Sequence, residues 1–333
     1  MVKKVKLGDA NVTAVAYGCM GLSQAYEPCS EEQSIRTLNA VLDMGYDHLD
    51  TAALYGFGKN EELLNKAIGH RRSEYFLASK CGLYRDASGK REINGRPEVL
   101  KKTCEDSLRR LGTDCIDLYY LHRIDLDVPV EESIGALMDM RDQGKIRFIG
   151  LSEPSPKTLN RALNLCPLAA VQSELSLWTR TPNDEVAEIC SQRGVAFVSY
   201  SPLGRGFLGG KIRDMDVLAE KDIRHTMPRF QGESFVTNVR ILDELAALAD
   251  EHGITVAQLA LAWVLAQGDH ILAIPGTRFE DCAKQNLTAA ELEVDASALV
   301  KAATIMSPST ISGERWSEKL LMEVDSEQYR YSA

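Results

Sequence analysis

The sequence predicts an α/β fold, a (β/α)8 TIM barrel, from the order and the number of its apolar runs. Eight short apolar runs alternate with helix-length amphipathic segments along nearly the whole chain, which is typical of a parallel sheet covered by helices. Eight strands also close a barrel, and the 333 residues exceed the ~250 of a plain barrel. A doubly wound open sheet is the alternative. The eight runs span 14–17, 46–49, 75–79, 116–121, 146–151, 169–172, 195–200 and 271–274.

The segments between these runs carry helix-start and helix-stop signals. Ser30 and Gln33 fit a capping box. Prolines are expected in first turns, where their missing N–H is not needed, and glycines just past helix ends. The predicted helices span 30–44, 58–68, 97–111, 129–143, 156–165 and 182–193. The residues concerned are Pro97, Pro129, Pro156 and Pro182 at starts, and Gly45, Gly69, Gly112, Gly144 and Gly194 at ends.

Five further segments extend the bare barrel. Residues 5–12, with Gly8-Asp9 in their middle, predict a hairpin that caps the bottom of the barrel. A long connection over 201–234 indicates a functional loop, and 236–252 and 255–267 predict two consecutive helices. The polar tail from Ser307 is expected to cross the barrel mouth. We expect one domain, residues 1–333.

Charge and cysteine usage limit the classes of partner. A net charge of −10 argues against a nucleic-acid or anionic-membrane surface. The sequence contains no run of ~18 apolar residues, so no membrane span is predicted. The eight cysteines form no C-x-x-C pair, which favours reduced thiols in a cytoplasmic protein. The six histidines show no His-x-His pair, so we expect no metal site and disfavour a metal-dependent hydrolase. The oligomeric state, monomer or homo-oligomer, is left open.

Four residues of chemical interest lie at the ends of neighbouring predicted strands, where barrel active sites form. The second run ends in Asp50 and is followed by Tyr55, the third ends in Lys80, and the fourth ends in His122. Carbonyl reduction needs a proton donor for the developing alkoxide. A tyrosine can serve if a lysine cation lowers its pKa and an aspartate holds that lysine, while a histidine orients the substrate oxygen.

Three blocks resemble the aldo-keto reductase family in the family's order. The first runs from Gly45-Tyr-Asp-His-Leu-Asp-Thr-Ala-Ala-Leu-Tyr-Gly56 through 60–68, the second spans 107–122, and the third is Ile274-Pro-Gly-Thr-Arg278 with Gln285-Asn286. The resemblance implies reduction of aldehydes or ketones by hydride from NADPH. It implies Tyr55 as proton donor, Asp50 and Lys80 as its tuning pair, and His122 as the group that orients the substrate.

The same resemblance implies a cofactor site along the rim. Ser152, the residue after it and Gln172 are expected to hold the nicotinamide carboxamide, and Tyr200 to stack on the ring. Position 153 is Glu where the family usually has Asn, and a carboxylate accepts hydrogen bonds but cannot donate one. The loop Ser201, Pro202, Leu203, Gly204, Arg205 and Gly206 is expected to fold over the diphosphate.

Arg278 is expected to select NADPH over NADH. An arginine that opens the last helix, preceded by Gly276 and the hydroxyl of Thr277, can bind a 2′-phosphate. Gln285 and Asn286 are expected to reach the adenine by the same resemblance. The string Gly204-Arg-Gly-Phe-Leu-Gly209 matches a dinucleotide-binding motif, but no clear helix follows it immediately, so we do not interpret it as one.

Tyr26, Trp178 and Trp316 are the candidate substrate-pocket residues, because each lies on a predicted rim loop or on the tail. A small carbonyl compound is the expected partner. The alternative function is a nucleotide-binding regulatory protein, similar to channel subunits of the same family, with little turnover.

Overall fold

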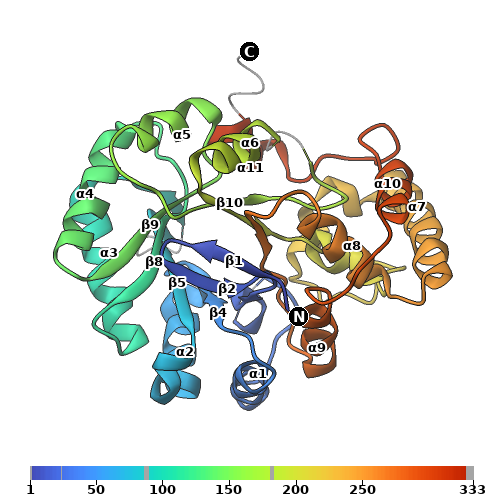
Figure 1. Cartoon of the computed structure of the whole chain (residues 1–333), viewed down its shortest axis with the longest axis horizontal. Helices are drawn as coiled ribbons and strands as arrows, with labels where there is room; N and C mark the ends of the chain where they lie inside the picture. The colour runs from blue at the N-terminus through green and yellow to red at the C-terminus, as the bar shows by residue number, and fades with distance from the viewer. Residues whose placement is uncertain (1, 24, 86–89, 181–183, 328–333) are drawn as a thin grey trace.

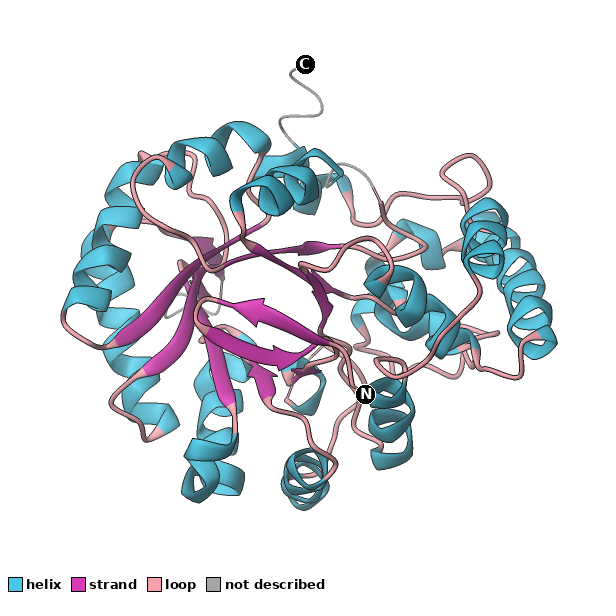
Figure 2. Cartoon of the chain, in the orientation of Figure 1, coloured by secondary structure: helices cyan, strands magenta, loops and turns pink. Residues whose placement is uncertain are grey.

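The computed structural model describes residues 2–23, 25–85, 90–180 and 184–327 of the chain. Within these residues, eight parallel strands form one sheet with helices packed around its outside (Figure 1, Figure 2). The strands are β3 (Tyr17–Gly18), β4 (His48–Asp50), β5 (Phe76–Cys81), β8 (Ile116–Leu121), β9 (Ile146–Ser152), β10 (Ala170–Glu174), β11 (Ala196–Tyr200) and β12 (Ile271–Ala273).

The sheet closes on itself between its first and last strands. Val15 bridges Ala273 in parallel, and the amide of Ala16 donates to the carbonyl of Ala273 at 2.8 Å. Because the strand order otherwise leaves β3 and β12 as edges, these contacts join the two ends. The predicted (β/α)8 barrel is therefore confirmed, and the open doubly wound sheet is the wrong alternative.

The helices follow the predicted segments with small shifts at their ends. Pro97 and Pro156 begin their helices as predicted, whereas Pro129 lies one residue before its helix and Pro182 falls outside the described residues. Gly69 directly follows α2 as predicted, but its φ is −57° and the chain continues into a 3₁₀ turn. The outer helices are α1 (Glu31–Asp43), α2 (Lys59–Ile68), α3 (Pro97–Leu111), α4 (Val130–Asp142), α5 (Pro156–Leu163), α6 (Asp184–Arg193), α7 (Gly232–Glu251), α8 (Val256–Leu265), α9 (Glu280–Thr288), α10 (Ala296–Ile305) and α11 (Glu318–Leu321).

Only half of the predicted capping box at α1 forms. The Ser30 hydroxyl accepts from the amide of Gln33 at 3.2 Å, but the Gln33 side chain donates to the carbonyl of Arg278 instead of returning to Ser30. A complete capping box occurs at the start of α8, between Thr255 and Gln258. Gln33 thus ties α1 to the segment before α9, a contact between distant parts of the chain.

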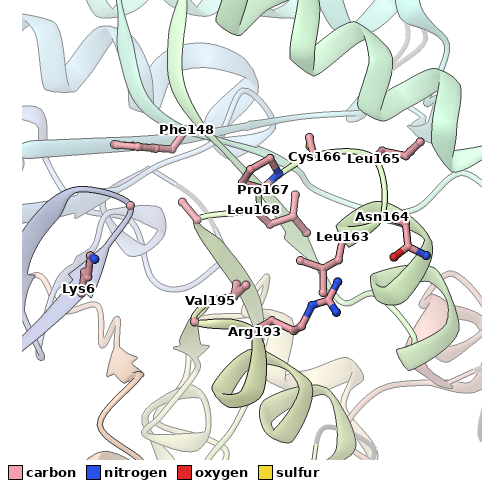
Figure 3. A pocket seen from close by; sticks show the side chains of 13 residues that line it. Lys6, Phe148, Leu163, Asn164, Leu165, Cys166, Pro167, Leu168, Arg193 and Val195 are labelled. Carbon is pink, nitrogen blue, oxygen red and sulfur yellow. The ribbon is translucent and has the colours of Figure 1, made fainter.

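The predicted hairpin forms and crosses the amino ends of the barrel strands (Figure 1). It consists of β1 (Lys4–Leu7) and β2 (Ala10–Thr13). A hollow of about 580 Å³ lies beside it, lined among others by Lys6, Phe148 and Arg193 (Figure 3). Both charged side chains are exposed there, and the hollow lies at the end of the barrel opposite the strand ends that carry the candidate residues.

A second hairpin was not predicted. β6 (Leu83–Arg85) and β7 (Arg91–Ile93) pair antiparallel in the loop after β5. This loop leaves the carboxyl end of its strand, so the hairpin adds to the wall around the barrel mouth.

Candidate active site

The predicted aspartate, tyrosine and lysine meet at the carboxyl ends of β4 and β5. The Lys80 ammonium donates to Asp50 Oδ1, to the carbonyl of Thr51 at 2.7 Å and to the Tyr55 hydroxyl at 3.3 Å. Lys80 is fully buried and Asp50 is 2% exposed, whereas the Tyr55 side chain is partly exposed. A buried ion pair therefore presents its cation to a hydroxyl at the barrel mouth.

The charge state of this group follows from two opposing effects. Burial lowers the pKa of Lys80, but the Asp50 carboxylate outweighs it and the pKa lies above its ordinary value. Burial raises the pKa of Tyr55, and the charge of Lys80 opposes that rise without cancelling it. The lowering effect expected of Lys80 is therefore present, but burial outweighs it: Tyr55 is a neutral phenol at neutral pH, beside a cation that stabilises its phenolate.

His122 stands next to Tyr55 as a neutral imidazole. The two rings meet edge to face with their centroids 5.9 Å apart. Burial first, and then the charges of Arg123 and Lys80, hold the pKa of His122 well below its usual range. A neutral imidazole can donate one hydrogen bond without bringing a charge to the site.

Ser152 and Gln172 lie on neighbouring strands beside this group. The Gln172 amide donates to Asp50 Oδ2 at 2.8 Å, so both carboxylate oxygens of Asp50 are held. The Ser152 hydroxyl accepts from Arg123 Nη1 at 3.3 Å, and the same nitrogen donates to the His122 carbonyl. The sequence interpretation missed Arg123, although its position directly after the strand-end His122 was a usable signal.

The Glu153 carboxylate is occupied by protein donors. Its Oε2 accepts from Arg315 Nη2 at 3.0 Å and from the Ser326 hydroxyl at 2.8 Å, while its Oε1 accepts from the amide of Glu174 at 2.9 Å. Burial alone would raise the pKa of Glu153, but the charge of Arg315 outweighs it and lowers the pKa to about 2. Glu153 thus faces the tail.

Arg315 joins three carboxylates into one buried cluster. It lies 3.0 Å from Glu153, 3.1 Å from Glu174 and 2.9 Å from Glu327. We call these four residues the Arg315 cluster. Sequence reasoning missed it because Arg315 is 162 residues from Glu153 along the chain and lies in a polar tail with no recognisable pattern. The cluster confirms that the tail folds onto the strand ends.

The proposed substrate residues separate into two environments. The Trp178 indole is 2% exposed and stacks on Phe207 at 4.1 Å between ring centroids. Trp178 as a pocket residue is therefore wrong, because its ring packs in the core. Tyr26 and Trp316 stay partly exposed, and the Trp316 indole N–H donates to Glu174 at 3.3 Å.

The loop after β11 is held in a tight left-handed conformation. Ser201 has φ of +49° and Arg205 has φ of +58°, which is costly for residues with a side chain. Gly204 is required, because a Cβ there would lie 2.7 Å from the Trp178 ring. Residues Gly204–Gly209 form a 3₁₀ helix, so the glycine string does not open a dinucleotide-binding α-helix.

Arg278 does not open the last helix. It lies two residues before α9, and α10 and α11 follow. Its guanidinium pairs with the Glu27 carboxylate and donates to the Glu27 carbonyl at 2.8 Å. The side chain therefore has an anionic partner from the rim loop of β3, which a phosphate would have to displace.

The other predicted adenosine-side residues lie before α9 and in its second half. The Thr277 hydroxyl accepts from the amide of Phe279 at 3.1 Å. Gly276 packs so closely on Gly18 that a Cβ would lie 2.5 Å from the Gly18 carbonyl oxygen. On α9, Asn286 is buried and Gln285 is partly exposed.

The described ranges hold neither a metal-binding group nor a membrane-spanning helix. No group of three or more His, Cys, Asp or Glu side chains could hold a metal ion there. None of the helices in that part of the chain is long and apolar enough to cross a membrane.

Comparison with known proteins gives a family model and similar sequences for this chain. Residues 14–304 match the model of the aldo/keto reductase family. The chain is 41% identical over 295 residues to the aldo-keto reductase yakc of Schizosaccharomyces pombe, whose name specifies NADP(+), with 87% of each chain covered. It is 42% identical over 280 residues to a probable aldo-keto reductase 1 of Glycine max, covering 83% of this chain and 81% of the other.

Solved structures of similar proteins share the architecture. The glycerol dehydrogenase AKR11B4 of Gluconobacter oxydans superposes with a TM-score of 0.83 at 28% identity, covering 94% of this chain and 97% of that one. An aldo/keto reductase of Klebsiella pneumoniae, in complex with NADP and acetate, gives a TM-score of 0.71 at 27% identity and covers 95% and 99%.

Proposed function

Because the chain belongs to the aldo/keto reductase family, a family of oxidoreductases, we propose that it reduces an aldehyde or ketone to an alcohol with NADPH. One observation carries the proposal: the buried Lys80 ammonium contacts the Asp50 carboxylate and the Tyr55 hydroxyl at once. A cation fixed beside a neutral phenol lowers the cost of phenolate formation as the proton leaves.

The residues at the rim fit a bound nicotinamide. Tyr200 ends β11 with a partly exposed side chain, and Ser152 and Gln172 lie on the two strands before it. The Nε of Arg123, next to Ser152, is a buried donor without a partner among the described residues. NADPH, when bound, supplies hydride to the carbonyl carbon of the substrate.

We assign the rest of the cofactor to the opposite part of the rim. The turn over 201–206 is suited to a diphosphate, because successive backbone N–H groups in a turn can form a concave anion site. The 2′-phosphate is assigned to Thr277 and Arg278, with the phosphate replacing Glu27 as the partner of Arg278. Gln285 and Asn286 are assigned to the adenine. The assignment is supported by the relative named for NADP(+), by the similar structure in complex with NADP, and by the position of Arg278.

The protein's own groups perform the proton step. Tyr55 donates its proton to the carbonyl oxygen as charge develops there, and Lys80 stabilises the phenolate that remains. The neutral His122 donates a hydrogen bond to the same oxygen and orients it. Asp50, held by Lys80 and Gln172, keeps the ammonium in place.

The test follows oxidation of NADPH and, separately, NADH by the purified protein with para-nitrobenzaldehyde. We expect steady turnover with NADPH, weaker turnover with NADH, and a loss of about 10²- to 10⁴-fold in kcat for Tyr55→Phe. Tyr75→Phe removes a hydroxyl at the other end of β5 and is the matched control, with unchanged kcat. Tight NADPH binding without turnover across a broad carbonyl panel would contradict the proposal and favour the regulatory alternative.

A further inference from the structure

Arg205 is an arginine held in an unusual backbone conformation at the barrel mouth. Its φ of +58° lies in the left-handed region, between Gly204 and Gly206, which are left-handed too. Only glycine adopts this region without cost, and a residue with a Cβ pays about 1–2 kcal/mol. The turn therefore retains an arginine where glycine would be more stable, which indicates that the side chain has a task.

The guanidinium of Arg205 lies among aromatic side chains. Its central carbon is 4.5 Å from the centroid of the Trp316 ring and 5.5 Å from that of Tyr200. Tyr26 is linked to the same residue through Arg224, which stacks on the Tyr26 ring and donates to the Arg205 carbonyl at 3.2 Å. Within the described residues, no carboxylate lies within ion-pair distance of Arg205. The cation has stacking partners but no anion.

The surrounding charges show that this lack of an anion is specific to Arg205. Arg224 also stacks on the Tyr26 ring, at 5.0 Å, but it is paired with Asp222 at 2.6 Å. Glu174, the acid whose charge acts on Arg205, is held by Arg315 and by the Trp316 indole. The nearby acids are thus committed elsewhere, and the Trp316 wall is fixed in place by one of them.

Arg205 also lies on the side of the proton donor. It stacks on Tyr200, which ends β11 at the same barrel mouth, and its positive charge is the smallest of the effects that oppose the burial-driven rise of the Tyr55 pKa. A guanidinium can bind a carboxylate through two parallel hydrogen bonds. A substrate whose carbonyl oxygen sits at Tyr55 can therefore place a second, anionic group on Arg205.

We infer that the substrate is a carbonyl compound that carries a carboxylate, which Arg205 binds between the walls formed by Tyr26 and Trp316. The inference rests on the proposed reductase function and adds its substrate class. It assigns the Arg205 side chain to the substrate and leaves the backbone amides of the same loop for the cofactor diphosphate.

The experiment compares two aldehydes of nearly the same shape, para-carboxybenzaldehyde and its neutral methyl ester, at saturating NADPH. The wild type is expected to favour the carboxylate in kcat/KM by about tenfold or more, as for one charge-assisted interaction. Arg205→Met should abolish this preference, because kcat/KM should fall much more for the carboxylate than for the ester, and the Kd for NADP+ of the same variant separates this from an effect on the cofactor. Arg205→Lys should keep part of the preference. Arg213→Met, a change in an exposed ion pair, is the matched control and should keep all of it.

Each other result identifies what fails. If Arg205→Met slows both aldehydes equally and raises the Kd for NADP+, the guanidinium serves the cofactor diphosphate and the inference is overturned. Reduction of the ester by the wild type with no advantage for the carboxylate also overturns it, while the proposed function stands. If the wild type reduces neither aldehyde nor any member of a broad carbonyl panel, the proposed function fails and the inference falls with it.

Discussion

Two buried ionic groups lie at the same rim of the barrel and differ in what they leave available. The Lys80 ammonium is paired with Asp50, yet it also contacts the hydroxyl of the partly exposed Tyr55. In the Arg315 cluster, by contrast, the guanidinium and the carboxylates of Glu153, Glu174 and Glu327 are all buried and bond to one another.

The difference separates an ion pair that can influence a reacting group from an ion pair that holds the fold together. A buried ion pair can tune a neighbouring group only if one of its charges reaches that group, and Lys80 meets this condition. In the Arg315 cluster the guanidinium pairs with the three carboxylates, and these pairs hold the tail against β9 and β10. We therefore expect changes at Lys80 to affect turnover and changes at Arg315 to affect stability first.

The largest expected effect is on the free energy of unfolding in Arg315→Met. Removal of one partner leaves three buried carboxylates without their cation, which costs about 3–5 kcal/mol for a buried pair. Urea denaturation measures this loss of unfolding free energy, and limited proteolysis of the tail should become faster. The exposed pair of Arg213 with Asp243 supplies the control, since Arg213→Met should cost under about 1 kcal/mol. Equal losses in the two variants would remove the distinction between the cluster and a surface ion pair.

The next effect is the acid sensitivity of the cluster. The folded-state pKa of Glu153 is about 2, below its ordinary value of 4.5, so its stabilisation is complete above about pH 5 and disappears as pH falls towards 2. The shift corresponds to about 3 kcal/mol. Urea midpoints measured from pH 6 to pH 2 should fall more steeply for the wild type than for Glu153→Gln. Parallel curves would show that Glu153 does not carry this dependence. Glu131→Gln, in the exposed pair with Arg161, should follow the wild type.

The next effect, on turnover, is expected for Lys80→Met. Loss of the cation removes the stabilisation of the Tyr55 phenolate, and kcat should fall by about a hundredfold or more. The Kd for NADP+ should stay within a factor of a few, as measured by quenching of tryptophan fluorescence. A variant that loses cofactor affinity and keeps kcat would place Lys80 in binding rather than in proton transfer.

The smallest effect is expected for Arg278→Gln. The guanidinium is replaced by a neutral amide, so the preference for NADPH over NADH in kcat/KM should drop by about tenfold, mostly through the KM for NADPH. Glu27→Gln should move the KM for NADPH in the opposite direction, because it removes the competing carboxylate. No change of cofactor preference in either variant would assign the 2′-phosphate to other residues.

The sequence predicted much of the candidate site because its signals are local. Asp50, Lys80 and His122 each end a strand that an apolar run already marks, and the carboxyl ends of parallel strands meet at one edge. Strand ends could therefore be compared without knowing how the chain closes. The net pKa of Tyr55 was outside this reasoning, because it depends on how deeply the hydroxyl is buried.

The sequence by itself determined the barrel, its hairpin cap and the four residues at the strand ends, since each follows from periodicity of two or 3.6 residues and from local capping. Only the tertiary structure decided that Glu153 pairs with Arg315, that Arg278 pairs with Glu27, and that Trp178 packs in the core while Arg205 stays among aromatic rings. Each of these depends on contacts between segments far apart in the chain. Such contacts are selected by packing and by the pairing of buried charges, and neither leaves a pattern in the local sequence.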